Sequence, residues 1–132
     1  FNPSTERVLD SEVVLIAVLD NRIIGLGGIA LKYNIPRSII ILDKTSQGKG
    51  LGKKLMTEIL KEGRNNHNIM VGVIEEGNNA ALRLDLSVGY KMCWTRNNLH
   101  YLFYLYNIKG LIIFYMIKAL FPLIKVIDYV RR

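Results

Sequence analysis

Glycine and lysine residues are concentrated in residues 46–55, which read SQGKGLGKKL. The apolar run 38–43 precedes this stretch and is typical of a buried strand. From residue 51 to residue 60, apolar side chains recur at helical spacing. The glycines therefore lie where a strand leads into a helix, and the first turn of a helix attracts anions through its free amides and its dipole. We predict a phosphate-bearing ligand at residues 47–53.

The spacing of the glycines restricts the class of ligand. A Walker-type loop requires Gly-x-x-x-x-Gly-Lys-Ser/Thr, but Gln47 stands at its first position and Lys54 at its last. A dinucleotide fingerprint requires Gly-x-Gly-x-x-Gly, but Lys53 replaces its third glycine. The pattern that fits is Gln-x-x-Gly-x-Gly, filled by Gln47, Gly50 and Gly52. It resembles the acyl-coenzyme-A loop of the GNAT superfamily of N-acetyltransferases; a glycine-rich turn beside a solvated basic helix is the alternative.

A second motif lies about thirty residues further along the chain. Asn78-x-x-Ala81-x-x-x-Asp85-x-x-x-Gly89-Tyr90 is similar to the second GNAT motif, Asn-x-x-Ala-x-x-x-Tyr-x-x-x-Gly-Phe/Tyr. The main departure from the pattern is Asp85, which stands where many members of the family have a tyrosine. Together the two motifs make residues 12–106 resemble a GNAT-type acyltransferase domain.

Elements that position these motifs can be predicted from the chain in order. Asp20-Asn21 and Asn97-Asn98 each separate two apolar runs and indicate β-hairpins. Between them we expect a turn at 32–37 around Pro36, a strand at 38–43, a helix at 51–63, a strand at 69–74 and a helix at 80–88. The predicted fold class is α/β (α+β), with helices on the faces of a mixed sheet. The family resemblance implies that the sheet is mainly antiparallel, with splayed central strands.

The resemblance also implies acetyl-CoA as the cofactor and assigns residues to it. Gln47 and the amides of the glycine loop would hold the pyrophosphate, the strand ending at Leu42 would pair with the pantetheine arm, and Asn78 would contact that arm. The lysines of the loop would meet the 3′-phosphate or remain solvated charges. The expected coenzyme-binding residues are Leu42, Gln47, Gly48, Lys49, Gly50, Leu51, Gly52, Lys53 and Asn78.

Attack of an amine on a thioester requires a base for the amine and an acid for the leaving thiolate. Asp43 and Glu75 end the two strands expected to splay, and we favour one of them, acting through a water, as the base. Asp85 can serve as the acid only if burial raises its pKa strongly; otherwise it is a surface residue with no chemical role. Tyr90, Cys93 and Tyr101 are the substitutes for that acid.

Composition restricts the partners and metals that the chain could bind, and the compartment in which we expect it. The 132 residues are half apolar and carry a net charge of +7, which suits an anionic partner. No nucleic-acid partner is expected because no nucleic-acid-binding motif is visible. No metal is expected either, because one cysteine and two scattered histidines show no ligand spacing. A single cysteine and no recognisable signal peptide predict a cytoplasmic protein. The chain begins at Phe1 without an initiator Met, which leaves an upstream segment open.

Residues 107–132 form an apolar extension that we expect to be helical. Lys118 would lie near the middle of a spanning helix and Pro122 would bend it, so spanning is disfavoured. Three alternatives stay open for residues 108–130: packing on the domain, a homodimer interface, or a helix lying on an anionic membrane.

The resemblance implies an N-acyltransferase that moves an acetyl or related acyl group from coenzyme A to a primary amine by direct attack. The acceptor would be a small molecule or a peptide amine. The alternative is a non-catalytic acyl-CoA-binding or membrane-recruited interaction protein on the same fold.

Overall fold

Two hairpins form the outer parts of a six-stranded sheet. The computed structural model describes residues 11–131, and the side chains of residues 11–120. Strands β1 (Val13–Leu19) and β2 (Arg22–Lys32) form the first hairpin, and β5 (Lys91–Arg96) and β6 (Leu99–Leu105) form the second. The two turn residues of each have φ between 50° and 63°, as a two-residue primed turn requires. Both predicted hairpins are confirmed.

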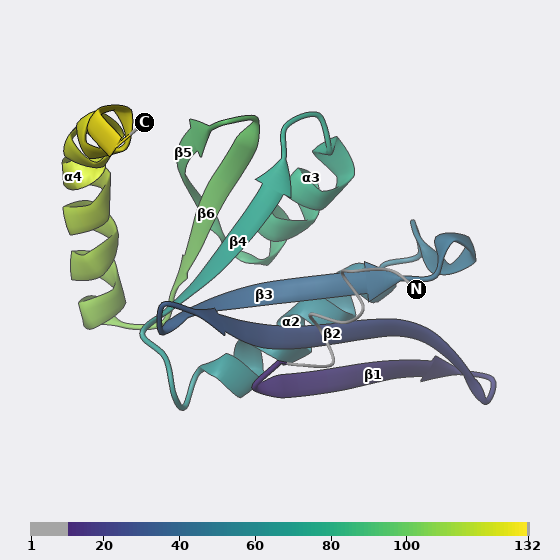
Figure 1. Ribbon diagram of the computed structural model, residues 1–132. Coiled ribbons are helices and arrows are strands. Elements are labelled where there is room, and N and C mark those ends of the chain that lie inside the picture. Colours follow the sequence, from purple (N-terminus) through teal and green to yellow (C-terminus); the bar gives the residue numbers. More distant parts are fainter. Residues whose placement is uncertain (1–10, 132) are drawn as a thin grey trace.

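The centre of the sheet is open on one side. Its order is β1-β2-β3-β4-β6-β5, and every neighbouring pair is antiparallel except β3 (Ile35–Leu42) with β4 (Ile69–Glu75). These two parallel strands are joined at one position, Arg37 opposite Val71, and separate toward their carboxyl ends (Figure 1). We call this opening the V. The predicted splay of the central strands is confirmed.

Helices cover both faces of the sheet. Helix α2 (Leu51–Gly63) follows a single 3-10 turn, η1 (Lys44–Ser46), and lies with α3 (Asn79–Val88) on one face. Helix α4 (Ile108–Arg131) lies on the other face, against β6 and β5 (Figure 1). Alternation along β4 separates the two cores, because Met70 contacts the α2 side while Val71 contacts Phe114 of α4. The predicted fold class, including the apolar C-terminal helix, is confirmed.

The stretch around Pro36 differs from the prediction. The expected turn at 32–37 is confined to Tyr33 and Asn34, and β3 begins at Ile35 with Pro36 inside it. Pro36 pairs with Leu31, but the adjacent pair Arg37 and Ala30 carries the ladder hydrogen bonds, so the missing N–H of proline faces away from β2. Pro36 therefore does not mark a turn. It occupies a strand position whose N–H is not needed for pairing with β2.

Within residues 11–131, no helix is long and apolar enough to cross a membrane.

Candidate active site

The glycine loop between β3 and α2 is open. Gly48 and Gly50 have φ of 78° and 76°, a backbone conformation that L side chains rarely adopt. A Cβ built on either glycine would meet no atom within 4 Å. Gly50 is the N-cap of α2 and provides no side-chain cap. The loop therefore leaves the end of the helix uncovered.

Backbone amides at the start of α2 are available to a ligand. The first amide of the helix with a bond to a carbonyl is that of Lys54, which donates to the oxygen of Gly50 at 3.3 Å. For the amides of Leu51, Gly52 and Lys53 the structure records no protein acceptor among the described residues. The positive end of the helix dipole adds to these donors, so this turn favours an anion.

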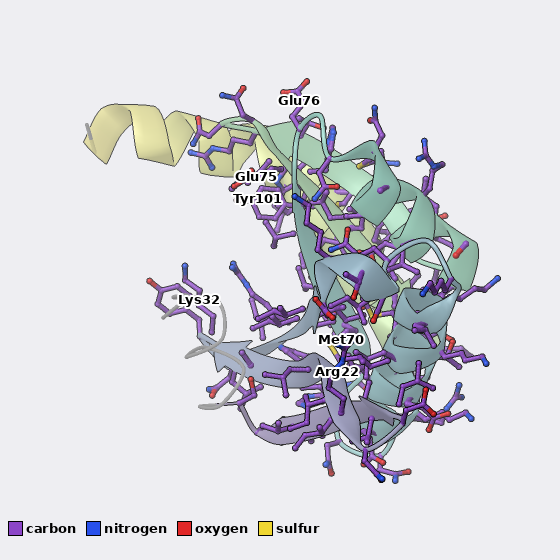
Figure 2. All side chains as sticks on the ribbon, turned by 90° about the vertical axis from the view of Figure 1, so that its right-hand side faces the viewer. Arg22, Lys32, Met70, Glu75, Glu76 and Tyr101 are labelled. Carbon is purple, nitrogen blue, oxygen red and sulfur yellow. The ribbon has the colours of Figure 1, made fainter. Side chains whose placement is uncertain are left out.

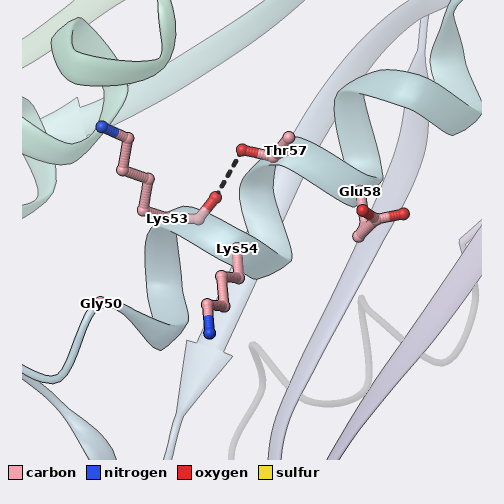
Figure 3. Close-up of a pocket in the computed structure, with 5 residues that line it drawn as sticks. All are labelled: Gly50, Lys53, Lys54, Thr57 and Glu58. Atoms are coloured by element: carbon pink, nitrogen blue, oxygen red, sulfur yellow. Dashed lines mark hydrogen bonds between the residues drawn. The ribbon is translucent and has the colours of Figure 1, made fainter.

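Lysine side chains surround the same turn. Lys53 and Lys54 project from different sides of α2 and line a shallow hollow with Gly50, Thr57 and Glu58 (Figure 3). The Thr57 hydroxyl donates to the carbonyl oxygen of Lys53 at 2.7 Å, so it is satisfied within the helix. Lys53 and Lys54 are both exposed.

The edge of β3 that faces the V has free backbone groups. The Asp43 amide donates to the Ile24 carbonyl of β2 at 2.7 Å. Because hydrogen-bonding direction alternates along a strand, the backbone groups of Leu42 and Ile40 point the other way, toward the V. The Gln47 side chain covers part of this edge, since its Nε2 donates to the Leu42 carbonyl at 3.4 Å. An extended ligand arm could pair with the rest of it.

Asp43 is held in an ion pair at the end of β3. Its carboxylate accepts a hydrogen bond from the Thr45 hydroxyl at 2.8 Å and lies 3.4 Å from the Arg22 guanidinium. The hydrogen bond with Thr45, aided by the charge of Arg22, lowers the pKa of Asp43. A base with a lowered pKa holds a proton weakly, which makes Asp43 the poorer of the two candidate bases.

Glu75 lies on the other face of the sheet from α2 and α3. Side chains alternate along β4, and Val73 packs in the cluster around Phe114, so Glu75 shares the face of Val73. Figure 2 places Glu75 beside Tyr101 of β6, the diagonal neighbour that the strand register predicts. Glu75 is exposed there, at the open end of the V. A ligand phosphate and this carboxylate would thus lie on opposite faces of the sheet.

Asp85 is buried, not a surface residue. Its exposed fraction is 5%, and its carboxylate lies against the backbone of Gly72 in β4. Burial raises the pKa of Asp85 to about 7. The expectation that Asp85 could be a surface residue was therefore wrong. The condition for an acid at this position, a strongly raised pKa, is met.

The closed end of the V holds a polar pair that the sequence did not reveal. Tyr90 and Ser38 share a hydrogen bond of 2.7 Å between their hydroxyl oxygens, and the Tyr90 ring lies beside Gly72. Burial raises the pKa of Tyr90 well above its usual value. Gly72 was a usable signal, since glycine inside an apolar strand often marks a close approach by another group. Burial raises the pKa of Cys93, another of the three substitutes, to about 11.

Asn78 is occupied at the start of α3. Its Oδ1 accepts a hydrogen bond from the Ala81 amide at 3.2 Å, which makes it the N-cap of the helix as predicted. A contact between Asn78 and a coenzyme arm would have to use its Nδ2 or its backbone. In the part of the chain that the structure describes, no three His, Cys, Asp or Glu side chains are grouped to hold a metal ion.

Comparison with known proteins identifies the class to which this fold and loop belong. The protein-family model described as "Acetyltransferase (GNAT) family" matches residues 3–90, which is 88 of the 132 residues. The chain belongs to the acetyltransferase (GNAT) family. A curated relative, L-methionine sulfoximine/L-methionine sulfone acetyltransferase of Salmonella typhimurium, is 37% identical over 60 residues. That alignment covers 45% of this chain and 34% of the relative.

Solved structures share the fold at low identity. YncA of Salmonella typhimurium, solved with its cofactor acetyl-CoA, matches with a TM-score of 0.65 and 22% identity over 71% of this chain and 64% of its own. The N-acetyltransferase PseH of Campylobacter jejuni, solved with acetyl coenzyme A, matches with a TM-score of 0.62 and 18% identity over 71% and 67%. The chain thus spans about two thirds of the length of these structures and about a third of the curated relative.

Proposed function

We propose that this chain transfers an acetyl group from acetyl-CoA to a primary amine, with residues 12–106 as the transferase unit. The observation that carries the proposal is the position of the open amides of Leu51, Gly52 and Lys53 beside the V. The amides anchor an anionic diphosphate, and the V admits an extended arm along β3. The complexes of YncA and PseH with acetyl-CoA support the same ligand here.

The residues of the loop suit the phosphates of the coenzyme in backbone conformation and charge. Gly48 and Gly50 leave a cradle that a side chain would narrow, and their positive φ keeps the turn in that shape. Lys49, Lys53 and Lys54 are exposed around it and supply charge for the phosphates. The backbone of Leu42 and Ile40 offers hydrogen bonds to the amide groups of the pantetheine arm.

Acetyl-CoA supplies a thioester, whose carbonyl carbon forms a bond to the amine nitrogen as its bond to sulfur breaks. We assign Glu75 as the group that takes the proton of the amine, directly or through a water, since it is exposed at the open end of the V. Asp43 is the second candidate for this base, disfavoured by its ion pair with Arg22.

Asp85 is assigned as the acid that protonates the leaving sulfur. A carboxyl group with a pKa of about 7 keeps its proton in a large fraction of molecules at neutral pH. The Asp85 carboxyl group lies next to Gly72, one residue beyond the point where β3 and β4 are joined, and is therefore close to the closed end of the V. This role replaces that of the tyrosine common at this position in the family, with a shorter side chain.

The test is a turnover assay that follows free thiol with acetyl-CoA and a panel of amines. Because the curated relative is named for methionine sulfoximine and methionine sulfone, these two amino acids belong in the panel. An amino sugar and a peptide with a free N-terminus represent the other acceptor classes. We expect saturable thiol release with at least one acceptor. Binding of coenzyme A without turnover of any acceptor would instead favour the non-catalytic alternative, and absence of binding would refute both.

A further inference from the structure

Helix α4 presents a second apolar face that no described part of the chain covers. One side of the helix, with Ile113, Phe114 and Ile117, packs against β5 and β6. The opposite side carries large apolar residues that are exposed, several by more than half of their surface. These residues, which we call the outer stripe, are Ile108, Leu111, Ile112, Tyr115, Met116 and Leu120.

The orientation of this helix is fixed at its first turn. Asn107 caps it, since its Oδ1 accepts a hydrogen bond from the Gly110 amide at 2.9 Å and its Nδ2 donates to Asn68 at 2.9 Å. Gly110 lies so close to the Asn68 carbonyl that a Cβ there would overlap it. The ring of Phe114 then packs edge-on against Phe103. The helix therefore cannot rotate to bury the outer stripe without breaking these contacts.

Lysines lie on the two edges of the outer stripe. Lys109 and Lys118 are nine positions apart, about two and a half helical turns, which places them on opposite sides of the helix. Lys118 lies over the Phe114 ring, 5.8 Å from its centroid, at the edge between the buried and outer faces. Residues 108–120 contain no Asp or Glu. The outer face of the helix is thus apolar in the middle and basic at both edges.

We propose that the outer stripe docks on an anionic phospholipid bilayer, with α4 lying parallel to the surface between the sheet and the lipid. An apolar stripe bordered by lysines matches the boundary between acyl chains and anionic head groups. A second copy of this chain fits less well, because pairing two outer stripes would bring four lysines together with no carboxylate from residues 108–120 to neutralise them. The net charge of +7 acts in the same direction.

The experiment is co-sedimentation of the full chain with two kinds of vesicle, phosphatidylcholine alone and phosphatidylcholine mixed with phosphatidylserine. We expect binding to the mixed vesicles that weakens with salt, and little binding to the neutral ones. The double variant Ile112→Glu/Met116→Glu should lose at least about tenfold in partitioning, because it places two charges at the bilayer boundary. The double variant Lys109→Glu/Lys118→Glu should lose about fivefold or more for each lysine.

Matched variants test whether binding depends on the outer stripe and its lysines, or only on net charge and exposed apolar residues in general. Lys32→Glu/Lys61→Glu changes the net charge equally at exposed positions on β2 and α2 and should keep most of the binding. Ile23→Glu/Tyr33→Glu places charges on exposed apolar residues of β2 and of the turn that follows it, and should also keep the binding. Elution of the chain as a dimer that Ile112→Glu/Met116→Glu splits would overturn the proposal in favour of a second copy. No binding to the mixed vesicles by a monomer, or equal loss in the matched variants, would overturn it outright.

Discussion

The carboxylate of Asp85 occupies the space that a side chain at position 72 would need. A Cβ built on Gly72 would lie 2.5 Å from Oδ2 of Asp85 and 3.3 Å from the Tyr90 ring. The Asp85 carboxylate can therefore take this position only because residue 72 has no side chain, so the residue types at the two positions depend on each other. Their contact lies at the closed end of the V, where β3 and β4 begin to separate.

The first prediction tests this contact. Gly72→Ala should lower the free energy of unfolding by about 1–3 kcal/mol, since the added methyl overpacks a buried site. In the double variant Gly72→Ala/Asp85→Ala the clash is absent, so the two substitutions should cost clearly less together than the sum of their separate effects. Urea unfolding of the four proteins gives the coupling energy. Additive effects would mean that Asp85 and Gly72 do not contact each other in solution.

The second prediction concerns the pH dependence of stability. The pKa of Asp85 is about 7 in the fold against 3.8 for the unfolded reference, so between these values the folded chain binds more protons. The free energy of unfolding should therefore fall as the pH rises from about 4 to about 7, by up to about 4 kcal/mol from this group. Asp85→Asn resembles the protonated form and should remove this slope. Parallel urea curves of the wild type and the variant across that range would contradict the buried position.

The third prediction separates the proposed acid from a structural role. Asp85→Asn should lower kcat by about 10²-fold or more, because an amide cannot protonate the leaving sulfur. The KM for acetyl-CoA should change little, since Asp85 lies against Gly72 of β4 and is not part of the glycine loop. Because the same substitution is expected to stabilise the fold above neutral pH, lower activity cannot come from unfolding. An unchanged kcat would assign the acid elsewhere.

The fourth prediction distinguishes the two candidate bases. Glu75→Gln should lower kcat strongly while keeping coenzyme binding, because it removes the carboxylate at the open end of the V. Asp43→Asn removes the charge that pairs with Arg22, while its amide oxygen can still accept the hydrogen bond from Thr45, and it should leave kcat nearly unchanged. Steady-state kinetics with a saturating amine compare the two variants. The opposite result would move the base to the end of β3.

The sequence was sufficient for the parts of the site that depend on local rules. Asp20-Asn21 and Asn97-Asn98 predicted both hairpins, and the glycine spacing at 47–52 predicted an open turn at the start of a helix. These features depend on turn chemistry and on backbone conformations that are encoded within a few residues. The splay of the central strands came from the family resemblance and not from the residues themselves.

Contacts between distant residues could not be predicted in the same way. Whether Asp85 was buried depended on Gly72, thirteen positions earlier, and nothing in the local helix pattern stated it. The pair of Ser38 and Tyr90 joins residues 52 positions apart. Pro36 was misassigned to a turn because a proline is tolerated within β3 only when its missing N–H would point away from β2, which the sequence does not state. Each of these features is set by tertiary packing, which a local pattern does not contain.

The fifth prediction tests the glycine loop against a control of equal backbone strain. Gly50→Ala and Gly77→Ala both place a methyl group at a positive φ, 76° and 95°, where no atom lies within 4 Å. Each should cost about 1–2 kcal/mol of stability for the left-handed backbone. Only Gly50 borders the free amides at the start of α2, so only Gly50→Ala should raise the KM for acetyl-CoA and the Kd for coenzyme A. Calorimetry with coenzyme A measures the second quantity without any acceptor. If both variants bind coenzyme A as tightly as the wild type, the phosphates do not lie at this turn, since a strained backbone at residue 50 would then have no effect on the ligand.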